Sequence, residues 1–327
     1  ALAGLGFLGG WSRKRKTATI AACVTATWKW SVVAAASLLL AGHICCASCS
    51  QSLAKESNNC TMASQEWNYL ELGNIRSTLI RQEDTILFQL IERAQFKRNF
   101  AIYQDDAEFL KGTGISGSYV RNLLQETEVI HSKARRYTSP DEKPFTSRSQ
   151  LPDPVLPPLV VPEEMKYLKS IDVNLNNKIY DLYTSTILPW ITKEGDDGQY
   201  GSSSVCDIQA LQALSKRIHY GTFVAESKFR SQPEEYTRLI KAGDRQGIMD
   251  LLTNKEVEEK VVKRVQNKAT AYGQEITDET SSVHGPAIPE DKLKLFKVNP
   301  ETMGKIYREI IIPLTKEVEV DYLLQRA

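Results

Sequence analysis

Apolar residues recur every three or four positions along most of the chain after residue 70. In 70–98 the apolar stripe contains Ile75, Leu79, Ile86 and Leu90, with Leu72, Ile80, Leu87 and Ile91 beside it. This spacing predicts an amphipathic α-helix. Similar patterns predict helices over 116–137, 174–193, 203–229, 233–242, 244–252, 255–272 and 301–326. No stretch alternates with the period of a strand and no βαβ pattern occurs, so the sequence predicts an all-α helical bundle.

Prolines predict where the helical pattern is interrupted. Pro189 should interrupt one helix and Pro313 should kink the last one, because proline lacks a backbone N–H and crowds the preceding turn. The proline-rich stretch 144–162 is predicted to be extended. Residues 273–299 have little periodicity and are predicted to form a flexible loop.

The two proline sites resemble each other. ILPWITKE at 187–194 is similar to IIPLTKE at 311–317, and each follows a Lys-Ile-Tyr sequence at a slightly different spacing. The similarity is short and favours an internal duplication only weakly.

The helix predicted over 203–229 combines cations with a core-facing side. Its stripe contains Leu214, Arg217, Gly221, Ala225 and Lys228. A cation on such a side is costly unless an anion meets it. The anion is either a carboxylate of the protein, in a structural ion pair, or a carboxylate of a ligand, and the pattern alone leaves both open.

Other helices carry polar residues at apolar positions. The unusual residues are Arg76, Arg217, Lys228, Asn254, Glu258, Thr315 and Glu319. They suit a small ligand with several negative charges, which they could bind and orient. No nucleophile or metal-ligand spacing accompanies them, and His219 lies off the Arg217 face, where packing is its expected role. This set suits a rearrangement driven by conformational restriction and electrostatics.

Four segments carry a specific resemblance: NIRSTLIRQEDTILFQLIERAQF at 74–96, HSKARRYTSPDEKPF at 131–145, LQALSKRIHYGTFVAESKF at 211–229 and IIPLTKEVEVDYLLQR at 311–326. They resemble the eukaryotic all-helical chorismate mutases, most of all the plant members. The resemblance implies a helical bundle of that type and a homodimer. It also implies conversion of chorismate to prephenate by a Claisen rearrangement, without a cofactor or metal, on the route to phenylalanine and tyrosine.

The resemblance also implies roles for the unusual residues. Arg76 and Arg217 would bind the two substrate carboxylates. Lys228 and Glu319 would hydrogen-bond the ether oxygen, on which negative charge develops. Glu319 can donate a hydrogen bond only when protonated, so burial must raise its pKa. The remaining residues would position the ring hydroxyl and a carboxylate (Asn254 and Glu258) or support the site (Thr315).

An effector site at the dimer interface is a further implication. In regulated members tryptophan activates and tyrosine inhibits, and phenylalanine is a third possible effector. The matching positions are Arg135, Arg136, Gly201, Ser202 and Val205. The Gly-Ser pair lies at a predicted helix N-terminus, which could receive a carboxylate. Val205 stands where fungal relatives have Thr, so one hydrogen bond to the effector would be lost. Some plant members are not regulated. The alternative role for the two arginines is that of a solvated helix end.

The first 61 residues differ from the rest in composition. Residues 1–55 contain no Asp or Glu, and 1–61 hold five of the six cysteines. This predicts an N-terminal extension (1–61), typical of an organelle transit peptide, before a mutase domain (62–327). A plastid stromal protein is expected. A secretory signal, and a cytoplasmic protein that starts at Met62, are the alternatives.

Charge and hydropathy exclude other classes of protein. The formal net charge of +1 argues against a nucleic-acid binder. The longest apolar run, 31–42, is shorter than the roughly 20 residues of a membrane span. A different class of function stays open, namely a catalytically silent bundle that binds an aromatic amino acid or a partner protein.

Overall fold

The computed structural model describes residues 68–157, 162–274 and 296–326. Over these ranges the regular structure is helical apart from one isolated bridge between Gln274 and Phe296, which confirms the all-α prediction. The predicted N-terminal extension, the boundary after residue 61 and most of the predicted loop 273–299 lie outside the described residues.

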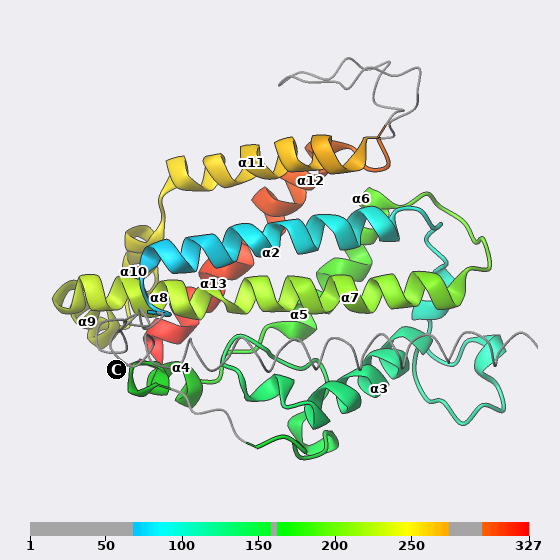
Figure 1. Ribbon diagram of the computed structural model, residues 1–327, viewed down its shortest axis with the longest axis horizontal. Helices are drawn as coiled ribbons and strands as arrows, with labels where there is room; N and C mark the ends of the chain where they lie inside the picture. The colour runs from blue at the N-terminus through cyan, green and yellow to red at the C-terminus, as the bar shows by residue number, and fades with distance from the viewer. Residues whose placement is uncertain (1–67, 158–161, 275–295, 327) are drawn as a thin grey trace, which may run out of the picture. The chain divides into compact units, whose positions relative to one another are not determined.

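Most predicted helices are confirmed with ends shifted by a few residues (Figure 1). The α-helices are α2 (Leu72–Arg93), α3 (Tyr119–Lys133), α4 (Lys166–Ser170), α5 (Asn176–Leu182), α6 (Leu188–Ile191), α7 (Tyr200–His219), α8 (Gly221–Ser231), α9 (Pro233–Ala242), α10 (Arg245–Leu252), α11 (Lys255–Gly273), α12 (Pro300–Ile306) and α13 (Ile312–Leu324). Short 3-10 turns cover Phe100–Tyr103, Glu108–Leu110, Arg136–Thr138, Arg148–Gln150 and Glu163–Met165. None of the described helices is both long and apolar enough to cross a bilayer.

Helices α2 and α7 lie side by side and antiparallel through the middle of the bundle (Figure 1). Helix α11 packs on α2, and α8 packs on α13. The predicted stripe of α2 is buried at Ile75, Ile86 and Leu90, whereas Ile80 is 38% exposed. Each large apolar side chain buried in this way contributes about 1.5–3 kcal/mol to folding, so the α2–α7 contact forms a large part of the core.

A buried ion pair ties the end of α2 to α7. Arg93 Nε lies 2.6 Å from Asp207 Oδ1, and both side chains are fully buried. Tyr103 and Tyr183 donate their hydroxyl groups to the same carboxylate. A helix that began at residue 203, as predicted, would have Asp207 in its first turn, where a carboxylate stabilises the N-terminus. Helix α7 instead begins at Tyr200, so Asp207 lies in its interior and that placement is wrong.

Both helix-interrupting prolines follow a π-helical turn. The turns Tyr183–Ile187 and Tyr307–Ile311 each end two residues before Pro189 or Pro313. A proline cannot donate to the preceding turn and its ring crowds the carbonyl there, so the wider turn accommodates it without ending the helix. The α-helix predicted around Pro189 is interrupted by its π-helical turn, as expected, and the turn before Pro313 has the same register relative to proline. The kink expected at Pro313 stays a prediction.

The single helix predicted over 203–229 is two helices, and that part of the prediction is wrong. They meet at Tyr220, whose carbonyl accepts the N–H of Phe223 in a tight turn. The Thr222 hydroxyl donates to the carbonyl of His219, which satisfies an acceptor at the end of α7. The cations of the predicted face therefore lie on two helices.

Candidate active site

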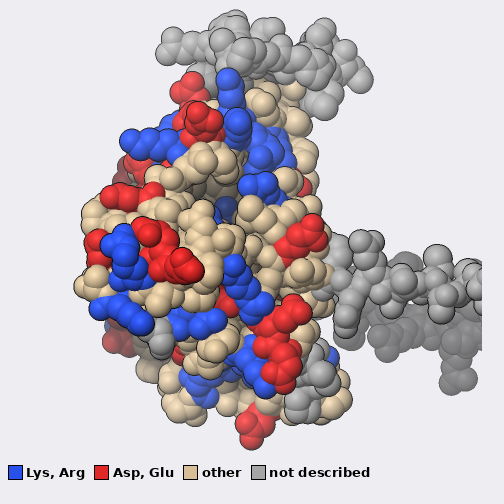
Figure 2. Space-filling model, turned by 90° about the vertical axis from the view of Figure 1, so that its left-hand side faces the viewer, with Lys and Arg blue, Asp and Glu red and all other residues tan. Residues whose placement is uncertain are grey.

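A cavity of about 230 Å³ opens between α2, α7, α8, α10, α11 and α13. Its apolar lining consists of Leu72, Ile75, Leu79, Val224, Leu252, Val257, Val261 and Ile312. Its polar lining consists of Arg76, Arg217, Lys228, Asn254, Glu258, Thr315, Lys316 and Glu319. Figure 2 shows a hollow on one face of the molecule with basic side chains in and around it. The structure thus brings all seven unusual polar residues together, and it adds Lys316.

Arg217 is the most deeply placed cation of the cavity. Its side chain is 5% exposed, and Nη1 donates to the Thr315 hydroxyl at 3.4 Å. Its Nε has no hydrogen-bond partner, and no carboxylate of the described chain pairs with it. The Thr315 hydroxyl itself donates to the carbonyl of Ile311. A buried guanidinium without an anion is costly. The described residues provide no structural ion pair for Arg217, which favours an anionic ligand in the cavity.

Lys228 and Glu319 face each other from α8 and α13. Their closest charged atoms are 3.9 Å apart, and Lys228 Nζ donates to the carbonyl of Leu252 at 2.7 Å. Burial raises the pKa of the Glu319 carboxyl to about 7, while Lys228 and Arg217 act in the opposite direction. This carboxyl is therefore protonated in a large fraction of molecules near neutral pH, as the sequence analysis required.

The N-terminus of α11 supplies two further polar groups. The Asn254 side-chain oxygen accepts the N–H of Val257 at 3.1 Å and caps the helix, which leaves the amide nitrogen available as a donor. Glu258, one turn later, pairs with Lys316 at 3.1 Å. Lys316 also lies 3.4 Å from the Thr253 hydroxyl.

Sequence reasoning missed Lys316 because it does not share the helical face of Thr315 and Glu319. Adjacent residues on a helix point about 100° apart. Lys316 nevertheless lines the cavity, from the neighbouring face of α13. The signal was present in the motif IIPLTKE, in which Lys316 directly follows Thr315.

The other predicted residues lie where the sequence placed them. Arg76 is exposed on the second turn of α2 at the cavity lining, and it forms no ion pair with any other described residue.

His219 is fully buried and does not line the cavity. Its Nε2 accepts the N–H of Leu175, its Nδ1 bonds to the carbonyl of Ser215, and burial lowers its pKa to about 4. It is a neutral packing residue.

Comparison with known proteins identifies the bundle. Residues 199–320 match the family model for chorismate mutase type II. The chloroplastic chorismate mutase 1 of Petunia hybrida is 47% identical over 255 residues, which are 78% of this chain and 75% of the relative. The chain belongs to the chorismate mutase family. The predicted resemblance and the predicted enzyme class, an isomerase, are confirmed.

Solved chorismate mutase structures have the same fold. The Candida albicans enzyme in complex with L-Trp matches with a TM-score of 0.69 and 41% identity, over 79% of this chain and 92% of that chain. The enzyme AtCM1 with tyrosine bound in its allosteric site also matches with a TM-score of 0.69, at 42% identity, over 80% of this chain and 98% of that chain.

The residues predicted for an effector site in this chorismate mutase do not lie together within one chain. Gly201, Ser202 and Val205 are exposed in the first two turns of α7. Arg136 instead donates to the side chain of Gln212, at 3.0 Å. Gln212 lies eleven positions beyond Gly201, which is roughly 16 Å along a helix axis. Within the described chain, the contact of Arg136 with α7 therefore lies about three helical turns from the start of that helix.

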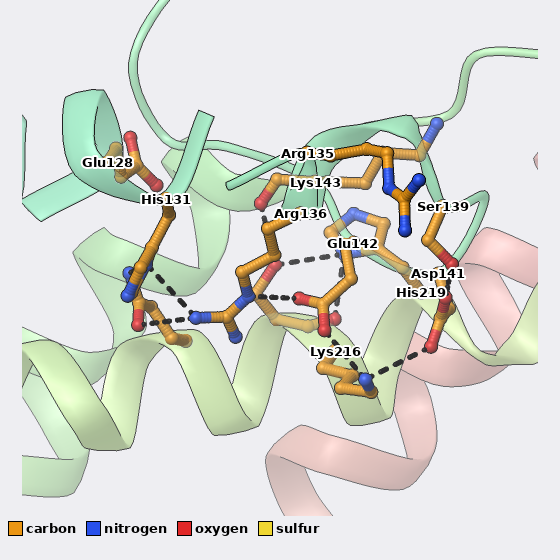
Figure 3. Close-up of polar contacts among 12 residues, drawn as sticks. Glu128, His131, Arg135, Arg136, Ser139, Asp141, Glu142, Lys143, Lys216 and His219 are labelled. Atoms are coloured by element: carbon orange, nitrogen blue, oxygen red, sulfur yellow. Dashed lines mark hydrogen bonds and ion pairs between the residues drawn. The ribbon is translucent and has the colours of Figure 1, made fainter. Parts of the chain in front are cut away.

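The side chain of Arg136 is occupied by contacts within the chain (Figure 3). Arg136 Nε donates to Glu142 at 2.8 Å, and Lys216 pairs with the other oxygen of Glu142 at 2.6 Å. Arg135 donates to the carbonyl of Pro157. An effector carboxylate would compete with Glu142 for Arg136.

Proposed function

We propose that this cavity binds chorismate and converts it to prephenate. In this rearrangement the ether C–O bond breaks as a C–C bond forms in one cyclic step, with no net gain or loss of protons or electrons. The protein then needs only to hold the reactive conformation and to stabilise negative charge on the departing oxygen. The observation that carries the proposal is the buried, unpaired guanidinium of Arg217 in a cavity that also contains Lys228 and Glu319.

The two carboxylates of chorismate are proposed to bind Arg76 and Arg217. Both guanidinium groups are available, because neither pairs with a carboxylate in the described part of the chain. Arg76 is exposed and Arg217 is buried. The carboxylate that enters first would be desolvated at Arg217, and the other would bind Arg76 near the solvent. Guanidinium groups suit carboxylates because they can donate two parallel hydrogen bonds.

Lys228 and protonated Glu319 are proposed to hydrogen-bond the ether oxygen. Their closest charged atoms are 3.9 Å apart, so the two groups do not form a direct hydrogen bond with each other. Donors already fixed where charge develops need no reorganisation during the reaction. This is the strongest contribution to the rate that the described side chains offer.

The ring hydroxyl and a carboxylate are proposed to contact Glu258 and Asn254. Glu258 accepts and the Asn254 amide donates, and both line the cavity from the first turns of α11. Thr315 is proposed to hold Arg217 in place from α13, which the 3.4 Å contact supports.

Two measurements test this function. The absorbance of chorismate reports its loss over time, and analysis of the product should identify prephenate. We expect turnover by the purified protein without any added cofactor or metal. A folded protein that leaves chorismate unchanged but binds an aromatic amino acid would favour the silent bundle instead.

Regulation by an aromatic amino acid at an interface between two copies is proposed as well. Related enzymes have been solved with L-Trp or tyrosine bound. In a homodimer, Arg135 and Arg136 of one chain would meet Gly201, Ser202 and Val205 of the other. Exposed apolar side chains on α3 and α7, Ile130 at 66% and Val205 at 49%, are consistent with such a contact.

The oligomeric state and the effector response test this proposal separately. We expect a dimer in analytical ultracentrifugation and a change in chorismate turnover on addition of tryptophan, tyrosine or phenylalanine. A dimer that is indifferent to all three amino acids would remove the effector site but keep the enzyme. A monomer would remove the dimer and the interface effector site, but not the active site, whose lining comes from one chain.

The location proposed for the protein is the plastid stroma, with 1–61 as a transit peptide. Its support is the composition of that segment and the chloroplastic Petunia hybrida relative. A fluorescent fusion of the full chain should be imported and shortened. A fusion that stays full-length in the cytoplasm would favour the cytoplasmic alternative that starts at Met62.

A further inference from the structure

The cavity contains one cation that the proposed chemistry does not use. Lys316 lies on α13 with its side chain 21% exposed, and its ammonium group is 3.1 Å from Oε1 of Glu258 on α11. We propose that Lys316 is a positioning residue, which holds the Glu258 carboxylate in the orientation that receives the ring hydroxyl of the substrate. This inference rests on the proposed function and deepens it.

The contacts of Lys316 fix both ends of this arrangement. Besides Glu258, its ammonium group lies 3.4 Å from the Thr253 hydroxyl. That hydroxyl donates to the carbonyl of Met249 at 2.7 Å, so its lone pair faces the lysine. Thr253 directly precedes Asn254, the cap of α11. One ammonium group on α13 therefore holds the first turn of α11, from which two proposed substrate ligands project.

A second ion pair, outside the cavity, joins α11 to the π-helical turn Tyr307–Ile311 that directly precedes α13. Arg308 lies 3.3 Å from Glu259, the neighbour of Glu258, and these side chains are 51% and 63% exposed. Neither residue lines the cavity. An exposed pair of this kind contributes little to stability. It is the matched control, because it links neighbouring parts of the chain without reaching the substrate.

Lys316 also belongs to the charges around Glu319. The groups that face Glu319 are Arg217 on α7, Lys228 on α8, Tyr236 on α9, Glu258 on α11 and Lys316 on α13 itself. The positive charge of Lys316 lowers the pKa of Glu319, and the negative charge of Glu258 raises it. Neutralising the lysine and neutralising the glutamate must therefore move that pKa in opposite directions.

The experiment measures kcat and KM for chorismate, as a function of pH, in Lys316→Gln, Glu258→Gln and the double variant. For Lys316→Gln we expect KM to rise roughly three- to tenfold, a range typical of coupled residues in contact. The decline of kcat/KM at high pH should move to higher pH in Lys316→Gln and to lower pH in Glu258→Gln. In the double variant, KM should match that of Glu258→Gln, because the lysine acts through the glutamate.

Two further variants complete the test. Lys316→Arg should recover most of the lost affinity, and Arg308→Gln should resemble the wild type in both KM and pH profile. Additive effects of Lys316→Gln and Glu258→Gln on KM would overturn the inference, since the lysine would then contact substrate directly. A Lys316→Gln variant with wild-type KM and pH profile would overturn it too, while leaving the proposed function intact. A wild-type protein without turnover would overturn the proposed function itself, and the inference with it.

Discussion

The ammonium group of Lys228 and the carboxyl group of Glu319 lie 3.9 Å apart, across the contact between α8 and α13. Charge-assisted hydrogen bonds between such groups are usually about 2.7–2.9 Å long. The pair is therefore close enough for electrostatic coupling but not closed by a direct hydrogen bond. An oxygen atom of a substrate placed beside both groups would receive two donors, provided that Glu319 carries a proton.

Activity should consequently depend on the protonation of Glu319. Burial raises the pKa of this carboxyl to about 7, and only the protonated form can donate a hydrogen bond to the ether oxygen. The fraction of protonated enzyme falls as pH rises through that value. We expect kcat/KM for chorismate to decline above about pH 7 in a series from about pH 5 to pH 9.

Glu319→Gln is the variant that isolates this effect. An amide nitrogen donates at every pH in the series, so the decline should disappear even if the maximal rate falls. A flat profile for the wild type, or an unchanged decline in Glu319→Gln, would assign the proton to another group.

The close contact between α8 and α13 should not tolerate a side chain at Gly221. A Cβ atom there would lie 2.9 Å from the backbone oxygen of Thr315 and 3.3 Å from Cγ of Glu319. Gly221→Ala should lower the free energy of unfolding by about 1–3 kcal/mol and lower kcat, because both displaced residues line the cavity. Urea unfolding and chorismate turnover measure the two effects.

Gly73→Ala is the matched control for this substitution. Gly73 is exposed near the start of α2, and a Cβ atom there meets only Glu71 Oε1 at 3.7 Å. Alanine is the better helix former, so stability should stay the same or rise by up to about 1 kcal/mol. Equal losses in the two variants would mean that the contact at Gly221 is not the cause.

Breaking the buried ion pair between α2 and α7 should be far more costly than breaking a surface pair. Asp207→Asn leaves the Arg93 guanidinium buried without its anion, for which a loss of about 3–5 kcal/mol in the free energy of unfolding is expected. Arg238→Gln removes an exposed pair with Glu235, whose side chains are 65% and 49% exposed, and should cost less than about 1 kcal/mol. Similar values in urea unfolding would contradict the structural role of Asp207.

Helical periodicity alone was sufficient to predict the all-α class, whereas the type of bundle was predicted from the family resemblance. The apolar stripes of α2, α9, α10 and α11 are read directly from their spacing because each helix buries one face. The break at Tyr220 could not be read in this way. No proline marks it, and a good amphipathic pattern continues across it. The break lies next to Gly221, where α8 closely approaches α13, and such a tertiary contact leaves no periodic signal in the sequence.

The candidate site was predictable where a polar residue interrupted an apolar face. Arg217 and Glu319 carried that signal, and both are buried in the cavity. Lys316 did not, because its side chain is partly exposed and reaches the cavity from the next face of α13. The buried ion pair of Asp207 could not be predicted because its partner, Arg93, lies 114 positions away in the chain, and such a pairing has no local pattern.

The central claim is that Arg217, which is buried and has no anionic partner among the described residues, binds a carboxylate of the substrate. Replacing Arg217 with a neutral side chain of similar size removes a costly buried charge, so it should not destabilise the fold. A loss of activity in such a variant then cannot be attributed to unfolding. Arg217→Met should therefore unfold at a urea concentration equal to or above that of the wild type.

The direct measurement is chorismate turnover by this folded Arg217→Met variant. We expect kcat/KM to fall by about a hundredfold or more, because a substrate that loses one of its two carboxylate anchors is no longer held in the reactive geometry. A folded Arg217→Met protein that converts chorismate at the wild-type rate would contradict the account.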